Sequence, residues 1–228
     1  MRRSTKAEYL DGPLDTVILS GNLRDLARVN RWLGGANLSW RAIRPFIEIG
    51  RTTRIVDVGT GGGDIPHMLL RRDKHRHQLH VLATDVRAEL VDVARATAAA
   101  GPSFEVRQDP PDRIDSPDGS VDVAHCSLVL HHLDADQAVA LLLEMRRVAT
   151  GAVVINDLAP GWHWWIGAWA LTRALTRNVY TRHDAPLSVR RAYSVDEVRS
   201  LAEQAGLRLV ARYDALPAYR YALVFVRA

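Results

Sequence analysis

Residues 57–63 combine an acidic side chain with closely spaced glycines, a pattern that suits the binding of a small ligand. Asp57 lies in an apolar, β-branched run, and Gly59, Gly61 and Gly63 follow at alternate positions. This order of residue types predicts a strand, a tight turn and the start of a helix. Glycine permits positive φ angles and close approach of a ligand, and the first turn of a helix offers unpaired N–H groups. We therefore expect a cofactor-binding loop here, with a plain turn between strand and helix as the alternative.

The same loop does not fit the two common phosphate-binding patterns. A dinucleotide-binding fingerprint, Gly-x-Gly-x-x-Gly, requires glycine at position 64, where this chain has Asp64. A P-loop requires Gly-Lys-Ser/Thr, and no lysine is near. Asp57, two residues before the first glycine, suits a ligand with a positive end rather than a pyrophosphate.

The segment from Asp57 to Gly63 resembles motif I of the class I methyltransferases, which use S-adenosylmethionine. Further similarity lies at 81–86 and 121–133. Within this class, the chain is similar to the ubiquinone/menaquinone-biosynthesis type and to its relatives that methylate oxygen in small molecules. The resemblance implies S-adenosylmethionine as the cofactor, with the glycine loop at its amino-acid end.

The resemblance also implies contacts to the rest of the cofactor. Asp85 ends the second predicted strand, where a carboxylate can accept both ribose hydroxyls, and Val86 would pack against the adenine edge. In similar enzymes an acidic residue after the third strand meets the adenine amino group, and here that position is Gln108-Asp109. Helix capping by Asp85 and a turn at Asp109 are the simpler alternatives. The expected cofactor-binding residues are Asp57, Gly59, Thr60, Gly61, Gly63, Asp85, Val86, Gln108, Asp109 and Cys126.

Two adjacent histidines follow the fourth predicted strand, at the edge where ligands bind in open α/β sheets. A neutral histidine can take the proton of an acceptor hydroxyl near pH 7. His131 and His132 are therefore candidate bases, although one of them is expected to pack or cap, and His183 beside Asp184 is a third candidate. Cys126 is expected to be a small buried residue rather than a nucleophile. No spacing of histidine, cysteine and acidic residues predicts a metal site.

Four of the six tryptophans lie between positions 162 and 169, on a predicted helix over 161–177. At helical spacing they belong to two apolar stripes. One stripe consists of Trp162, Trp165, Ile166 and Trp169, and the other of Trp164, Ala168, Leu171 and Leu175. A surface helix needs only one apolar face. We expect one face to pack on the domain while Trp162, Trp165 and Trp169 meet the substrate. A membrane surface, a second subunit, or burial of both faces are the alternatives.

Composition restricts the class of protein and the compartment. The chain has 228 residues, is 47% hydrophobic, and carries a formal net charge of +4, with its basic residues scattered rather than gathered in a track. We therefore expect no nucleic-acid partner. A single cysteine excludes an internal disulfide, and neither a signal peptide nor an apolar run of transmembrane length is present. These features predict a cytoplasmic protein without an integral membrane segment, and they leave a homo-oligomer open.

Strands and helices alternate from residue 54 onward, which predicts a mainly parallel sheet covered on both faces. Two final strands, 207–213 and 219–226, follow each other without a helix and can only pair antiparallel. We expect one α/β domain over 1–228 with a doubly wound, Rossmann-like sheet, a helical N-terminal cap over 1–50, and a helical lid over 159–193. The other expected strands are 54–58, 78–84, 103–107, 120–126 and 151–156. The other expected helices are 23–33, a short one from 37, 64–73, 87–99, 134–148 and 195–204.

The expected reaction is transfer of a methyl group to a hydroxyl of a lipophilic, phenolic small molecule. Residues 126–129, Cys-Ser-Leu-Val, lack the Asn/Asp-Pro-Pro-aromatic motif of enzymes that methylate amino groups of bases and glutamine. A phenol, with a pKa of about 10, also needs less help in ionising than an alkanol. Methylation of a ring carbon in a quinol-like acceptor is the main alternative. A regulator that binds the cofactor without catalysis is an alternative of a different class.

Overall fold

A seven-stranded sheet forms the centre of the computed structural model, which describes residues 2–73, 79–97, 103–215, 217 and 219–228. The strand order is β3-β2-β1-β4-β5-β7-β6. The first five strands are parallel, and β7 runs antiparallel to β5 and β6. The predicted mainly parallel sheet with its C-terminal antiparallel hairpin is therefore confirmed. The strands are β1 (Thr53–Val58), β2 (Leu79–Asp85), β3 (Phe104–Gln108), β4 (Val121–Ser127), β5 (Ala149–Leu158), β6 (Leu207–Asp214) and β7 (Arg220–Arg227).

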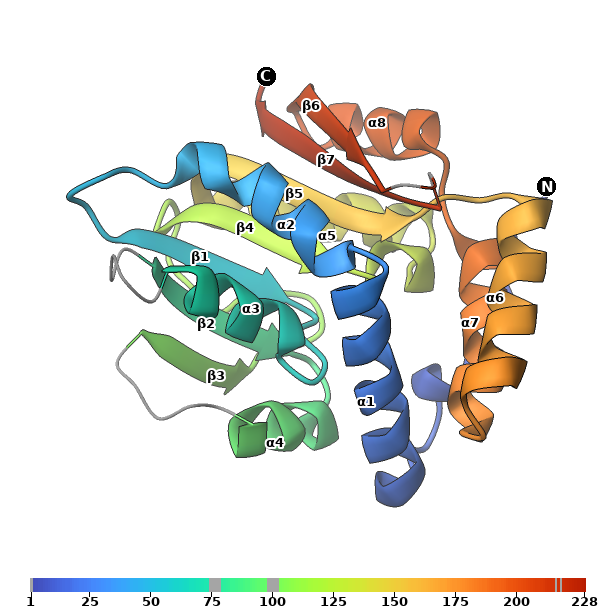
Figure 1. Cartoon of the computed structure of the whole chain (residues 1–228). Helices are drawn as coiled ribbons and strands as arrows, with labels where there is room; N and C mark the ends of the chain where they lie inside the picture. Colours follow the sequence, from blue (N-terminus) through green and yellow to red (C-terminus); the bar gives the residue numbers. More distant parts are fainter. Residues whose placement is uncertain (1, 74–78, 98–102, 216, 218) are drawn as a thin grey trace.

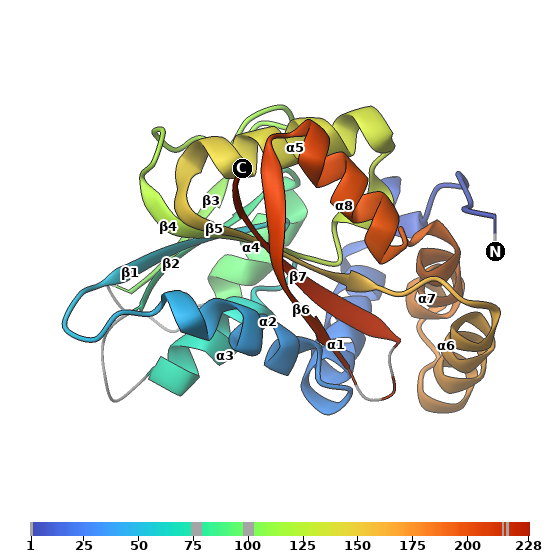
Figure 2. The same ribbon diagram turned by 90° about the horizontal axis from the view of Figure 1, so that it is seen from above.

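Helices cover both faces of the sheet, as Figures 1 and 2 show. One face carries α5 and α8, the other carries α2 and α3, and α4 packs on β2 and β3. The helices are α1 (Thr16–Trp32), α2 (Gly35–Ile43), α3 (Asp64–Asp73), α4 (Ala88–Thr97), α5 (Ala135–Val148), α6 (Trp162–Leu175), α7 (Val179–Arg191) and α8 (Val195–Gln204). Short 3-10 helices are η1 (Tyr9–Asp11), η2 (Arg44–Phe46) and η3 (Leu130–His132). The strand start expected at 78 and the helix end expected at 98–99 lie outside the described residues.

Two apolar clusters hold the layers together. Leu142 and Met145 of α5 pack with Val198 of α8 against one face of the sheet. Leu38 of α2 and Leu69 of α3 belong to the cluster on the opposite face. Both faces of the central strands are thus buried, which explains their nearly continuous apolar sequence.

Helices α1, α6 and α7 stand beyond the carboxyl ends of the parallel strands (Figure 1). Helix α7 contacts both α1 and α6, so segments from the two ends of the sequence meet over the same edge of the sheet. The prediction placed one helix over 161–177, whereas α6 ends at Leu175 and α7 follows it. Among the described helices, none combines the length and the apolar character needed to span a bilayer.

The N-terminal helices begin earlier than predicted. Helix α1 starts at Thr16, because Asp15 caps it by accepting hydrogen bonds from the N–H groups of Val17 and Ile18. Asn22, which directly precedes the helix expected over 23–33 and would have been its cap, lies inside α1 and donates from Nδ2 to Oγ1 of Thr181 at 3.1 Å. A polar residue can act as a cap or as a buried tertiary contact, and the sequence does not distinguish the two roles.

Helix ends with a complete local signal were predicted correctly. Asp134 and Gln137 form a capping box at the start of α5, and Ser194 and Glu197 form another at the start of α8. In each pair the two side chains satisfy each other's backbone N–H groups, so the structure is determined by neighbouring residues alone. These caps fix where the helices that follow β4 and α7 begin.

Candidate active site

The glycine loop between β1 and α3 needs its glycines for conformation. Gly59, Gly61 and Gly63 all have positive φ angles, of 68°, 55° and 76°. At Gly59 a Cβ atom would lie 2.5 Å from Cγ2 of Val129, at the exit of β4. Any larger residue there would therefore have to displace that segment. The loop follows β1, and β1 pairs with β4 at the point where the order of strands in the sheet changes direction. Open α/β sheets bind their ligands at this point.

Asp57 anchors this loop to the neighbouring strand. It is buried, and its Oδ2 accepts a hydrogen bond from Oγ1 of Thr60 at 2.7 Å. Its Oδ1 accepts from Nδ1 of the buried His125 on β4 at 2.5 Å, and Ser39 of α2 donates to the other ring nitrogen at 2.8 Å. Since both carboxylate oxygens have donors within the protein, Asp57 shapes the loop as well as bordering the cavity in front of it.

Asp85, the last residue of β2, lies next to the glycine loop. Its Oδ2 accepts from the N–H of Gly61 at 3.0 Å, and its Oδ1 accepts from the N–H of Arg87 at 3.1 Å. Burial raises the pKa of Asp85, and the hydrogen bonds from these N–H groups oppose that effect. Val86 follows with half of its surface exposed. Both residues line the same cavity as the glycine loop.

Gln108 and Asp109, at the end of β3, differ in burial and in contact with the cavity. Asp109 is buried, and its Oδ1 accepts from Nε of Arg107 at 2.8 Å. Its Oδ2 has no hydrogen-bond partner among the residues that the structure describes, although the residue borders the cavity. An unpaired buried acceptor is costly, so this atom fits a donor supplied by a ligand. Gln108 is exposed, donates to the carbonyl of Val86 at 3.0 Å, and does not line the cavity.

A cavity of about 1650 Å³ extends from the glycine loop across the carboxyl edge of the sheet. Small-molecule sites usually measure about 300–1,000 Å³, so this space is large enough for two ligands at once. Its wall is formed by the loop, by the ends of β2 and β4, and by α1, α6 and α7. Leu128, which lines it, is the one described residue other than glycine with a positive φ angle, at 59°.

The tryptophan helix faces the cavity with the opposite stripe from the one predicted. Trp164, Ala168 and Leu171 line the cavity, whereas Trp162, Trp165 and Trp169 do not. Trp162 is 69% exposed and Trp169 is 45% exposed. Since α6 is apolar on both sides, its orientation depends on its contacts with α7, which the sequence of α6 does not contain. The structure therefore places Trp164 at the cavity wall, and the substrate contacts of Trp162, Trp165 and Trp169 stay predictions that this orientation does not favour.

His131 and His132 lie at the cavity wall, together with an acid that sequence analysis did not select. Nδ1 of His131 donates to Asp157 and Nδ1 of His132 donates to Asp11, each at 2.7 Å. Glu8, from the N-terminal segment, is 3% exposed, and both of its oxygens approach these imidazoles. Burial raises the pKa of Glu8 to about 7, against the opposing effects of His132 and of a hydrogen bond from Ser188.

Two further sequence-predicted residues lie away from the cavity. His183 stacks on Tyr9 with ring centroids 3.9 Å apart, donates from Nδ1 to Asp184, and does not line the cavity. Its role as a base stays a prediction, which this placement does not favour. Cys126 is 1% exposed in the core under α5, and burial raises the pKa of its thiol. The lining of the cavity begins one residue later, at Ser127, so the structure does not place Cys126 at the cavity wall.

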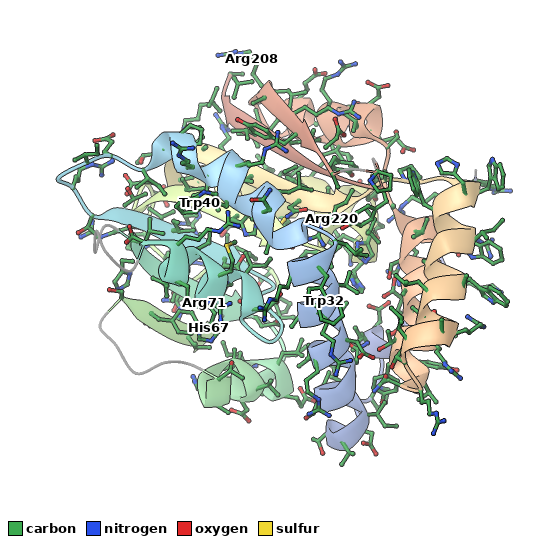
Figure 3. All side chains as sticks on the ribbon, in the orientation of Figure 1. Trp32, Trp40, His67, Arg71, Arg208 and Arg220 are labelled. Carbon is green, nitrogen blue, oxygen red and sulfur yellow. The ribbon has the colours of Figure 1, made fainter. Side chains whose placement is uncertain are left out.

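A buried arginine ties the N-terminal helices to the sheet. Arg220 of β7 is fully buried beside the junction of α1 and α2 (Figure 3). Its guanidinium donates to Asn156, Asn30 and Ser127, each at 2.6 Å. Asn30 of α1 in turn donates to Asp64 at the start of α3, at 2.8 Å. This network places α1 directly over the glycine loop. An arginine between apolar residues in a predicted strand was the signal that sequence analysis passed over.

Comparisons with known proteins agree with this geometry. The family model described as a methyltransferase domain matches residues 55–151. No curated protein matches the chain by sequence. Among solved structures, the chain is similar to an S-adenosylmethionine-dependent methyltransferase from Aquifex aeolicus, at 21% identity, with 95% of this chain and 100% of that chain covered and a TM-score of 0.65.

Two further solved structures have the same fold. Magnesium protoporphyrin IX methyltransferase (ChlM) from Synechocystis PCC 6803, with S-adenosylhomocysteine bound, is 15% identical over 96% of this chain and 90% of that chain, with a TM-score of 0.60. The mitomycin 7-O-methyltransferase MmcR is 18% identical, with 86% of this chain covered and a TM-score of 0.64. The chain spans about half of the length of MmcR, 54%.

The family match and the topology reinforce each other. The matched residues include β1, the glycine loop, β2 to β4 and the beginning of β5, which surround one side of the cavity. The rest of the sheet, through the antiparallel hairpin, follows the fold of the solved enzymes. The chain thus carries a methyltransferase domain over residues 55–151, in a structure that has the fold of S-adenosylmethionine-dependent methyltransferases.

Proposed function

We propose that this enzyme transfers the methyl group of S-adenosylmethionine to a hydroxyl of a lipophilic, phenolic small molecule. One observation carries the proposal: a single cavity joins the glycine loop to an apolar wall and to two imidazoles. The apolar wall includes Trp164, Ala168 and Leu171, and the imidazoles belong to His131 and His132. A flat aromatic acceptor would bury apolar surface against that wall, at about 25 cal/mol per Å².

The cofactor would lie along the carboxyl edge of β1, β2 and β3. Asp85 would accept the ribose hydroxyls, since its carboxylate is buried at the cavity wall beside the loop. The unpaired Oδ2 of Asp109 would accept the adenine amino group, and Val86 would contact the adenine edge. The loop residues Gly59 to Gly61 would face the amino-acid end, with Asp57 fixing their conformation through Thr60.

The chemical step requires little covalent work from the protein. The acceptor oxygen forms a bond to the methyl carbon while the bond from that carbon to sulfur breaks, and the electron pair stays on sulfur as S-adenosylhomocysteine. The hydroxyl proton has to leave during this step. A hydrogen bond from the hydroxyl to His131 or His132 would orient the oxygen and withdraw the proton. An apolar wall that excludes water would also remove competing solvent from the sulfonium.

The named neighbours are compatible with oxygen as the acceptor atom. MmcR is described as an O-methyltransferase acting on mitomycin, and PhzM as a pyocyanin biosynthetic protein. The more specific sequence prediction, a relationship to the ubiquinone/menaquinone-biosynthesis type, stays a prediction. Methylation of a ring carbon in a quinol-like acceptor is the main alternative, so the position of the new methyl group decides between the two proposals.

The test is incubation of the enzyme with ¹³C-methyl-labelled S-adenosylmethionine and a panel of phenols, quinols, polar amines and a small RNA. Product mass and carbon NMR then identify the atom that carries the label. A methyl ether on a phenol is the expected product, and Trp164→Ala should raise the acceptor KM without changing the affinity for S-adenosylhomocysteine. A methyl group on ring carbon would establish the quinone-type alternative, and turnover of amines or RNA in preference to every phenol would refute the proposal.

A further inference from the structure

Glu8, His131 and His132 surround a small gap at the wall of the cavity; we call these three residues the Glu8 cluster. Nε2 of each histidine lies 3.8 Å from a different oxygen of Glu8. All three potential ligand atoms lie within 4.8 Å of one another. Direct hydrogen bonds between nitrogen and oxygen span about 2.7–3.2 Å, so these groups do not bond to each other. Glu8 therefore lies close to both imidazoles without a direct hydrogen bond to either.

The outer nitrogens of both rings are already fixed by carboxylates. Asp157 accepts from Nδ1 of His131, and Asp11 accepts from Nδ1 of His132, each at 2.7 Å. A neutral imidazole that donates from Nδ1 presents a lone pair at Nε2. Two lone pairs and a carboxylate therefore converge on the gap. Histidines that bind metal ions almost always donate their second N–H to a carboxylate or a carbonyl in this way.

The surroundings of Glu8 supply orientation but little positive charge. Ser188 of α7 donates to Oε1 of Glu8 at 2.9 Å. Arg191, the nearest guanidinium, has its Nε at 3.9 Å from that oxygen. Its donors are engaged by Asp11 and by the carbonyls of His131 and His132. The cluster is thus rich in electron pairs, and Arg191, at 3.9 Å from Glu8, has its donors directed to other acceptors.

We propose that the Glu8 cluster binds a divalent metal ion of the zinc type, with an open position toward the acceptor cavity. Two histidines and one glutamate are a known ligand set of catalytic zinc. Tetrahedral bonds of about 2.0–2.1 Å place ligand atoms about 3.3 Å apart, so each 3.8 Å separation between Nε2 and Glu8 would have to shorten by about 0.5 Å on binding. The role of the ion in catalysis rests on the proposed function. The binding of the ion to the Glu8 cluster does not depend on that function.

The role of the ion follows from its position. An acceptor hydroxyl that takes the open position would have its pKa lowered by the ion, which acts as a Lewis acid. With both Nε2 atoms bound to the ion, the histidines would no longer accept the hydroxyl proton, which would pass to solvent. The ion would also hold the oxygen at a fixed point of the cavity that begins at the glycine loop. Substrates with a second donor oxygen beside the hydroxyl, such as catechols, would bind more tightly than monophenols because they can offer two ligands.

The experiment measures metal binding directly, on tag-free enzyme treated with EDTA and then dialysed. Zn²⁺ is titrated by calorimetry, and Co²⁺ is added to record its visible absorption bands. We expect one ion per chain and intense Co²⁺ bands typical of tetrahedral coordination. Glu8→Gln and His132→Ala should each weaken Zn²⁺ binding at least 100-fold.

The matched control is His183→Ala. His183 also donates from Nδ1 to a carboxylate but lies outside the Glu8 cluster, so this variant should bind Zn²⁺ like the wild type. Circular dichroism shows whether each variant remains folded. A second variant, Asp11→Asn, leaves all three ligands in place and should weaken Zn²⁺ binding about 10–100-fold, because His132 loses its carboxylate partner. Stoichiometry near zero, or binding unaffected by both Glu8→Gln and His132→Ala, would overturn the proposal.

The outcome is separable from that of the proposed function. If EDTA-treated enzyme binds no metal and still methylates a phenol at the full rate, the metal site is refuted and the proposed function stands. Conversely, Zn²⁺ binding that depends on the Glu8 cluster, without turnover of any phenol, would support the metal site and refute the proposed acceptor.

Discussion

Replacing Asp109 with asparagine tests the proposed adenine contact at a single atom. The side chain is 5% exposed, with Oδ1 held by Nε of Arg107 at 2.8 Å and Oδ2 without a described partner. In Asp109→Asn the remaining oxygen keeps the bond to Arg107, because the guanidinium has only donors. The new NH₂ group then replaces Oδ2, so two donors face each other once adenine binds.

The size of the effect follows from the bond that is lost. A hydrogen bond to a charged group contributes about 1.5–3 kcal/mol, and each 1.4 kcal/mol corresponds to a factor of ten in Kd. The Kd for S-adenosylhomocysteine should therefore rise about 10- to 150-fold. Calorimetry at constant pH and ionic strength measures this change. Asp115→Asn, an exposed substitution on the same loop that does not border the cavity, is the matched control and should leave Kd unchanged.

A ligand analogue with an acceptor in place of the adenine amino group distinguishes loss of adenine recognition from a general disturbance of the loop. S-inosylhomocysteine carries a carbonyl oxygen where adenine has its amino group, so it offers an acceptor to the new NH₂ of Asp109→Asn. The variant should bind this analogue more tightly than the wild type does. If both ligands lose affinity by the same factor, Asp109 supports only the fold of the loop. If S-adenosylhomocysteine binds the variant within twofold of the wild type, the proposed contact is wrong.

Three further predictions concern other parts of the molecule. Trp164→Ala should raise the acceptor KM about tenfold or more in steady-state kinetics, because it removes apolar surface from the cavity wall. Trp169→Ala, on the outer face, should leave KM unchanged, and equal effects of the two variants would contradict the orientation of α6. Arg220→Met should lower the free energy of unfolding by about 3–5 kcal/mol, because it leaves acceptors in α1, β4 and β5 without their hydrogen-bond donor. Chemical denaturation measures this change, and the exposed Arg212→Met should change the free energy of unfolding by less than about 0.5 kcal/mol; similar values for the two variants would disprove the importance of the network. Because burial raises the pKa of the Cys126 thiol and hides it, iodoacetamide should leave the native protein unmodified at pH 8 and label it in denaturant; rapid labelling of the folded enzyme, followed by mass spectrometry, would contradict the buried position.

Local chemistry allowed the sequence to predict the sheet, the glycine loop and two helix starts. At Gly59 and Gly63 a positive φ angle is needed, and glycine adopts it without the strain that a side chain adds. The boxes at Asp134 and Ser194 are closed within four residues. Asp85 and Asp109 follow strands, and parallel strands end at one edge, so their approach to the loop also followed from the order of elements.

Tertiary structure alone decided the acceptor side of the site. Helix α6 is apolar on both stripes, and its packing against α7 determined that Trp164 rather than Trp169 lines the cavity. Asp11 and His132 are 121 positions apart, and the N-terminal segment that carries Glu8 and Asp11 meets the histidines while it is held against α7 by Ser188. Periodicity and motifs describe neighbours along the chain, so a cluster assembled from opposite ends of the sequence has no local signal to reveal it.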